Sequence, residues 1–237
     1  MFPLCIRRLH SNAIGCTPPI SALDDAGIEL IRRRLANSMT NRAPHRFTYA
    51  AGASEAAVLL LLCTDKGQPS VLFEERQRRL LAHGGEVCFA GGKADSEDPT
   101  LEHTALRETR EELGLDPALV RVLGRMPPVP NKSGLLRVHP VVGVSEVELA
   151  AAAALRLNRE EVHRAFALPM SRFYGGRSVR ERFRDTGLKV PVYQTDKPGL
   201  SIWGLTAFIL HEFLIRISDP ANDSLDSLGS LDSLGKK

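Results

Sequence analysis

The stretch from Gly91 to Leu115, GGKADSEDPTLEHTALRETREELGL, constrains this chain more than any other part of its sequence. If its second half is helical, Glu108, Glu111 and Glu112 stand at i, i+3 and i+4 and share one face. Three carboxylates on one face repel one another, so the fold must compensate their charge. Two interpretations are open. The acids pair with neighbouring arginines on a solvent-exposed helix, or they hold a hard divalent cation such as Mg²⁺, which prefers oxygen ligands.

The glycines around this segment favour the metal site over the exposed helix. Gly91 and Gly92 precede the helix and would let the backbone approach both the helix and a phosphate closely. Gly114 follows the last turn, where a helix commonly ends on glycine. The pattern therefore predicts a helix over 100–114 with a glycine-rich loop against its acidic face.

The same residues resemble the Nudix box, G-x5-E-x7-R-E-U-x-E-E-x-G-U, in which U is apolar. The chain has Gly92, five residues, Asp98, eight residues, and then RETREELGL from Arg107. The second half of the box matches nearly throughout. The first half has Asp98 in place of Glu and one additional residue before Arg107, and Thr109 occupies the first U position.

This resemblance implies a hydrolase that cleaves a nucleoside diphosphate linked to another moiety, with Mg²⁺ or Mn²⁺ as cofactor. Glu108, Glu111 and Glu112 correspond to the metal ligands of the family and to its catalytic carboxylates. Either Glu108 or Glu112 corresponds to the group that orients or deprotonates the attacking water. Arg107 corresponds to the residue that braces the glutamates by charge-assisted bonds.

A further carboxylate is expected from outside the box, because Nudix enzymes often use one. Glu160 and Glu161 in NREEVHRAF are the candidates. A pair of solvated surface acids explains these two residues equally well.

The segment upstream of the box, VLFEERQRRLLAHGGEVCFAGGKAD, narrows the resemblance to one branch of the family. It is similar to the motif of coenzyme A diphosphatases, L-L-T-x-R-[SA]-x3-R-x3-G-x3-F-P-G-G. The matching residues are Leu72, Arg76, Gly85, Phe89, Gly91 and Gly92. The departures are Phe73 and Glu74 at the Thr position, Gln77 for Ser or Ala, and Ala90 for Pro. The GGKxDxxD run through Asp98, with its additional residue, also resembles this branch.

The branch implies coenzyme A or acyl-coenzyme A as substrate and 3′,5′-ADP and (acyl-)4′-phosphopantetheine as products. Contacts with the substrate are then expected at Arg76, Gly91 and Gly92. The substrate carries a 3′-phosphate, for which Arg76, Arg78 and Arg79 are candidate partners because guanidinium binds phosphate bidentately. These arginines are equally compatible with solvated surface charge. Two alternatives remain: another substrate, such as ADP-ribose, NADH or capped RNA, and a non-catalytic binding module of the same fold.

Composition limits the other classes of partner. The chain has 237 residues and a net charge of only +3, without a basic stripe interleaved with aromatics, so no nucleic-acid partner is expected. Its longest apolar run, from Ala56 to Cys63, is far shorter than the ~20 residues that span a bilayer, so no membrane span is expected. Such a chain is expected as a monomer or homodimer.

The sequence divides into four expected regions. Residues 1–20 contain two arginines and a serine but no acid, which is typical of a mitochondrial transit peptide, although an ordinary flexible tail has a similar composition. Residues 21–54 are expected to form a helix and a linker. Residues 55–218 are expected to form the Nudix domain, located in the mitochondrion. The low complexity of residues 219–237 predicts a disordered tail.

Periodicity within these regions predicts a mixed α/β domain. Helices are expected at 23–38, 100–114 and 206–218, and strands at 55–64, 71–76, 120–129, 137–147, 190–195 and 200–205. Residues 158–173 are expected to form a helix or turn that bends at Pro169. The resemblance implies that these elements assemble as a Nudix-type α/β/α sandwich with a mixed sheet.

Overall fold

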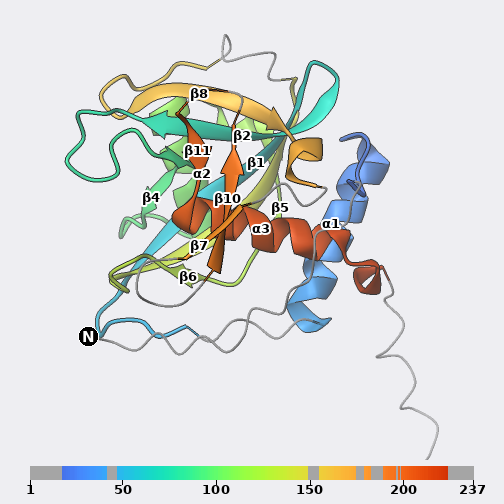
Figure 1. Cartoon of the computed structure of the whole chain (residues 1–237), viewed down its shortest axis with the longest axis horizontal. Coiled ribbons are helices and arrows are strands. Elements are labelled where there is room, and N and C mark those ends of the chain that lie inside the picture. Colours follow the sequence, from blue (N-terminus) through green and yellow to red (C-terminus); the bar gives the residue numbers. More distant parts are fainter. Residues whose placement is uncertain are drawn as a thin grey trace, which may run out of the picture.

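A mixed eight-stranded sheet forms the centre of the molecule (Figure 1). The computed structural model describes residues 18–41, 47–148, 155–174, 179–182, 189–195, 197 and 199–223. The strands of the sheet are β1 (Ser54–Asp65), β2 (Gln68–Arg76), β3 (Val87–Cys88), β4 (Gly91–Lys93), β5 (Val120–Arg125), β6 (Val129–Pro130), β7 (Leu136–Ser145) and β8 (Val162–Pro169). The main path runs β3-β2-β1-β7-β5, while β4 pairs with β1, β6 with β7 and β8 with β2. Only β1 and β7 run parallel.

Helices cover both faces of this sheet because β1 and β7 are apolar on both faces. Strands that are buried on both sides read as continuous hydrophobic runs, as Ala56 to Cys63 does. Helix α2 (Leu101–Leu113) packs on one face against Ala57, Leu59 and Leu61. Helices α1 (Asp25–Asn41) and α3 (Gly204–Ser218) belong to the core on the other face, with Ala56, Leu60 and Leu62. The expected α/β/α sandwich with a mixed sheet is confirmed.

A second, three-stranded antiparallel sheet lies on the α3 side of the core. It contains β9 (Val179–Arg182), β10 (Lys189–Gln194) and β11 (Ser201–Ile202) in the order β11-β10-β9. The strand expected at 190–195 is confirmed. The strand expected at 200–205 is only two residues long, because α3 already begins at Gly204. Short 3₁₀ turns, η1 (Pro117–Leu119), η2 (Met170–Phe173) and η4 (Pro220–Asn222), complete the described elements.

The expectation of a helix or turn over 158–173 is wrong for Val162–Pro169, whereas Met170–Phe173 beyond Pro169 does form the turn η2. Residues 162–169 form β8, which pairs along nearly the whole of β2. Glu75 of β2 is fully buried, and Arg164 stands directly opposite it and donates from Nε to its carboxylate at 2.6 Å. The strand conformation of β8 therefore depends on its pairing with β2, which is distant in the sequence, and local periodicity does not reveal such a pairing.

The segments that flank residues 55–218 contribute to the same core. Ile31 and Leu35 of α1 are fully buried against it. Beyond α3, the guanidinium of Arg34 donates to both carboxylate oxygens of Asp223 at 2.6 Å, so residues 219–223 are held against α1. Residues 1–17 and 224–237, which include most of the expected targeting segment and tail, lie outside the described residues.

No helix in the described part of the chain has both the length and the apolar character that crossing a membrane requires.

Candidate active site

Helix α2 carries the acidic face, and both of its ends are fixed by capping. The Thr100 hydroxyl accepts a hydrogen bond from the backbone N–H of His103 at 3.1 Å, which satisfies a free donor of the first turn. Gly114 ends the helix at φ 67°, and a Cβ there would lie 2.7 Å from Cβ of Arg156. Glycine is therefore required at this position by conformation and by space, and the end of α2 is held close to the segment that leads into β8.

Arg107 braces the outer part of the acidic face. Its Nε and Nη2 each donate to the Asp98 carboxylate at 3.1 Å, and Nη2 also donates to the Lys93 carbonyl at 3.1 Å. The same guanidinium lies 3.0 Å from Glu108 and 3.1 Å from Glu111. Hydrogen bonds from Arg107 hold the pKa of Asp98 well below its usual range. Asp98 thus anchors the arginine to the loop before α2, and the arginine orients two of the glutamates.

Glu108 lies directly over the glycine pair. A Cβ on Gly92 would fall between 2.4 and 2.7 Å from the carboxyl atoms of Glu108, so a side chain at residue 92 would displace that carboxylate. Gly91 has φ 152°, and a Cβ there would lie 2.3 Å from the Ala57 carbonyl oxygen. Burial raises the pKa of Glu108, and the neighbouring Arg107 opposes the rise. The two glycines allow a half-buried carboxylate to lie against the backbone of β4.

Glu112 is the most buried acid of α2, with 2% of its surface exposed. Its Oε2 accepts a hydrogen bond from the backbone N–H of Gly91 at 2.8 Å. Burial raises the pKa of Glu112, and the carboxylate of Glu74 raises it further, while the Gly91 N–H and Arg76 oppose these effects. A second buried carboxylate, Glu74 of β2, therefore faces Glu112 across the gap between the sheet and α2.

Glu111 lies at the edge of this cluster and not inside it. Its side chain is 56% exposed and pairs with Arg107. The structure thus brings Glu108, Glu112 and Arg107 together with the glycine pair, and leaves Glu111 facing solvent. In the part of the chain that is described, no three acidic, histidine or cysteine side chains are already arranged to hold a metal ion.

The structure separates the two candidates for an additional carboxylate. Glu160 is exposed and pairs with Arg79. Glu161 is half-buried, and its charge raises the pKa of both Glu74 and Glu108. Glu161 is therefore the member of the pair that faces the cluster.

The three arginines expected at the substrate have different surroundings. Arg76 is largely buried, and its Nη1 lies 3.4 Å from Oε1 of Glu112. Arg78 is mostly exposed, with Nε 3.5 Å from the buried Glu75. Arg79 is exposed beside Glu160. Arg76 therefore belongs to the carboxylate cluster, whereas the other two extend towards solvent.

Comparison with known proteins identifies the family. The sequence profile of the NUDIX domain matches residues 53–142. The chain is 36% identical over 172 residues to the uncharacterized Nudix hydrolase NudL of Pectobacterium atrosepticum, covering 70% of this chain and 83% of that protein. It is 37% identical over 202 residues to the human mitochondrial coenzyme A diphosphatase NUDT8, covering 81% of this chain and 78% of that protein.

The chain belongs to the Nudix family. It is a hydrolase that acts on diphosphate bonds. Among solved structures, a Nudix hydrolase from M. Smegmatis, RenU, matches 53% of this chain and 74% of its own, with a TM-score of 0.41 and 22% sequence identity.

Nudix hydrolases use divalent metals, and the side chains of this Nudix hydrolase fit such an ion. The donors facing the gap between α2 and the sheet are carboxylate oxygens, which Mg²⁺ and Mn²⁺ prefer. Burial raises the pKa of both Glu74 and Glu112, and Oε2 of Glu74 has no hydrogen-bond partner among the described residues. A cation would relieve the repulsion between these buried charges.

Glu74 is the site residue that sequence reasoning missed. In the sequence it stands out only as a departure from Thr in the branch motif. The available signal was the pair Glu74 and Glu75 inside an otherwise apolar strand, because adjacent strand residues point to opposite faces. One of the two had to face α2.

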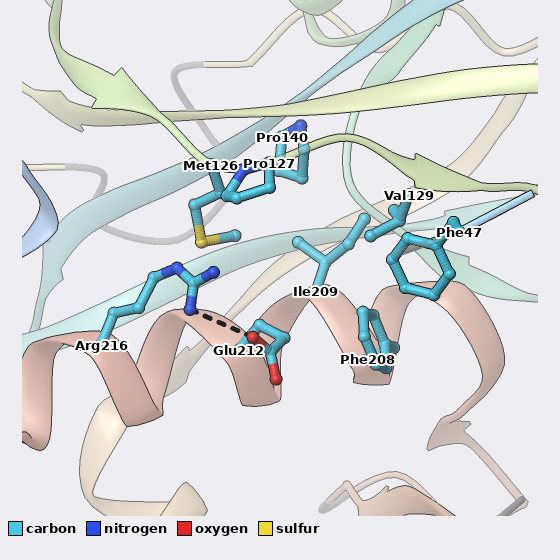
Figure 2. A pocket seen from close by; sticks show the side chains of 9 residues that line it. All are labelled: Phe47, Met126, Pro127, Val129, Pro140, Phe208, Ile209, Glu212 and Arg216. Atoms are coloured by element: carbon cyan, nitrogen blue, oxygen red, sulfur yellow. Dashed lines mark hydrogen bonds and ion pairs between the residues drawn. The ribbon is translucent and has the colours of Figure 1, made fainter. Parts of the chain in front are cut away.

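An apolar pocket lies on the other face of the sheet, between α3 and β7 (Figure 2). Arg216 donates to Glu212 at 3.1 Å along its lining. The lining residues are Phe47, Met126, Pro127, Val129, Pro140, Phe208, Ile209, Glu212 and Arg216. The sheet separates this pocket from the carboxylates beneath α2, so it is not part of the hydrolytic site.

The Asp98–Arg107 pair predicts a pH-dependent stability difference. Because the pKa of Asp98 is depressed on folding, its contribution is present above the unfolded value of about 3.9 and is lost as pH falls through the lower folded value. Asp98→Asn should destabilise the protein at pH 7 by roughly 1 kcal/mol, a modest value because Arg107 of the pair remains partly exposed. Urea denaturation from pH 7 to pH 3 measures this difference, which should shrink below about pH 4.

Glu97→Gln, which changes an exposed acid of the same loop, is the matched control and should alter stability by less than about 0.5 kcal/mol. A penalty for Asp98→Asn that stays constant down to pH 3 would contradict the depressed pKa of Asp98.

Proposed function

We propose that this Nudix hydrolase cleaves the diphosphate of coenzyme A and acyl-coenzyme A, releasing 3′,5′-ADP and (acyl-)4′-phosphopantetheine. The observation that supports this substrate is the 37% identity to the human coenzyme A diphosphatase over 81% of the chain. The geometry supports diphosphate chemistry, because buried carboxylates, a cationic brace and a glycine pair meet at one place.

Glu108, Glu111 and Glu112 are the proposed metal ligands, with Mg²⁺ or Mn²⁺ as cofactor. When bound, the ion would polarise the diphosphate and lower the pKa of a coordinated water. Glu108 or Glu112 would orient that water or accept its proton, and the burial that raises the pKa of both makes each carboxylate a stronger base. Arg107 would keep Glu108 and Glu111 in place from the solvent side.

The glycine pair and Arg76 are the proposed contacts with the diphosphate. Gly91 and Gly92 keep side chains away from the space beside Glu108, so a phosphate could approach the backbone there. Arg76 lies beside Glu112 and would turn from the carboxylates to the phosphate oxygens once a cation compensates the acids. Arg78 and Arg79, which extend towards solvent, are the proposed partners of the 3′-phosphate.

Product analysis tests the substrate. Purified protein with Mg²⁺ or Mn²⁺ should convert coenzyme A to 3′,5′-ADP and 4′-phosphopantetheine, identified by mass spectrometry. ADP-ribose, NADH and capped RNA form the comparison panel. Slow cleavage of coenzyme A beside fast cleavage of another member of the panel would refute the proposed substrate.

Removal of one proposed ligand tests the site itself. Glu112→Gln preserves an acceptor for the Gly91 N–H but removes the charge, so kcat should fall at least about a hundredfold while the circular dichroism spectrum is unchanged. Glu97→Gln is the control and should retain full activity. An active Glu112→Gln enzyme would exclude Glu112 from the metal site.

A substrate that lacks the 3′-phosphate distinguishes the roles proposed for the three arginines. Arg76→Ala should raise KM by roughly tenfold for both coenzyme A and its 3′-dephospho form, because Arg76 lies beside the diphosphate site. Arg78→Ala and Arg79→Ala should raise KM for coenzyme A alone. Equal effects of all three variants on the two substrates would rule out a 3′-phosphate contact at Arg78 and Arg79.

Residues 1–20 are proposed as a mitochondrial targeting segment. A fluorescent fusion of the full chain should accumulate in mitochondria, and the fusion that lacks residues 1–20 should not. Mitochondrial localisation of the shortened fusion would refute the proposal.

A further inference from the structure

Glu74 is a buried acid that the family motif does not supply. It lies on β2, and its side chain has no exposed surface. Leu72, two residues earlier on the same face, packs in the core cluster that contains Ala105 and Leu113 of α2. Glu74 therefore faces α2, at the level where Glu112 enters the gap.

The carboxylate of Glu74 is only partly satisfied by its surroundings. Cys88 lies on β3 directly opposite Glu74 and donates from Sγ to Oε1 at 3.2 Å. A thiol is a weak donor. Oε2 is buried and has no hydrogen-bond partner among the described residues. The nearest guanidinium, that of Arg76, is 3.9 Å from Oε1, beyond hydrogen-bonding distance. A buried carboxylate in this state is unfavourable unless another group compensates its charge.

The proposed metal ligands lie next to this unsatisfied group. The same Arg76 nitrogen is 3.4 Å from Oε1 of Glu112, so a single guanidinium stands beside both carboxylates. Burial raises the pKa of Glu74, and the charges of Glu161 and Glu108 contribute to the rise. Glu74 and Glu112 thus share one guanidinium, that of Arg76, while Arg107 lies beside Glu108 on the solvent side.

Glu75 provides the contrast on the opposite face of the same strand. It is equally buried, but its Oε2 accepts from Arg164 at 2.6 Å and Arg78 lies 3.5 Å from its Oε1. The fold therefore provides Glu75 with a close cation of its own. Glu74 instead points into the carboxylate cluster and has no comparably close cation among the described residues.

We infer that Glu74 supplies a further carboxylate ligand to the cation held by Glu108 and Glu112. The inference rests on the metal dependence proposed above and adds a strand residue to a site otherwise built from one helix. The ion would contact the oxygen of Glu74 that the protein leaves unpaired, and Arg76 would be released towards the phosphates. Glu74 therefore coordinates the metal directly, in addition to packing against α2.

Metal affinity, measured apart from turnover, tests the role of Glu74. Titration of the full chain with Mn²⁺, followed by the electron paramagnetic resonance signal of the free ion, gives the Kd for each variant. Glu74→Gln should weaken Mn²⁺ binding at least about tenfold, since it removes one charged ligand. Without metal, this variant should be at least as stable as the wild type, because it removes an uncompensated buried charge.

Glu75→Gln is the matched control, because it changes the neighbouring buried acid on the other face. It should destabilise the protein by disrupting the contact with Arg164, yet leave the Kd for Mn²⁺ unchanged. Glu74→Thr also removes the carboxylate and replaces Glu74→Gln if the glutamine variant does not fold.

The outcomes separate this inference from the proposed function. If the wild type and Glu74→Gln bind Mn²⁺ equally, Glu74 is not a ligand, while the site of Glu108 and Glu112 remains. If the wild type does not bind Mn²⁺ at all, both the proposed metal dependence and the role of Glu74 are overturned. A loss of affinity in Glu75→Gln equal to that in Glu74→Gln would also refute the inference, because it would reflect general loosening of β2.

Discussion

The burial of Glu112 between α2 and the sheet is the constraint on which the rest of the site depends. A carboxylate enters such a place only if its oxygens are satisfied, and the Gly91 N–H satisfies one of them at 2.8 Å. That bond requires the backbone of β4 to lie close to the helix, at a φ that favours glycine. Thr100 and Gly114 then fix where the helix begins and ends, and so determine which of its acids face inward.

Charge compensation divides the acidic face into two parts. On the solvent side, Arg107 joins Asp98, Glu108 and Glu111 in a network that the chain completes by itself. On the inner side, Glu74 and Glu112 share the more distant Arg76, and burial raises the pKa of both. The inner part therefore lacks a close cation of its own, which suits the proposed metal held by Glu108 and Glu112 beside a diphosphate.

Much of the fold could be predicted because its signals are local. Gly114 as the terminating glycine and helical spacing predicted α2, and the apolar run from Ala56 to Cys63 predicted β1. Residues 162–169 were wrongly assigned because β8 exists only through its pairing with β2, in which Arg164 faces Glu75. A pairing between residues almost ninety positions apart leaves no periodic pattern in 162–169 itself.

The sequence by itself determined the chemistry on one helix face: the spacing of Glu108, Glu111 and Glu112, the adjacent Arg107 and the glycines that flank them. Those features are local, since helical geometry alone places such residues side by side. Only the tertiary structure decided which acids are buried. In the folded chain Glu111 is exposed, and Glu161 rather than Glu160 lies near the carboxylate cluster. Glu74 of β2 faces Glu112. Burial and electrostatic environment depend on what packs across the gap, and residues distant in the sequence supply that packing.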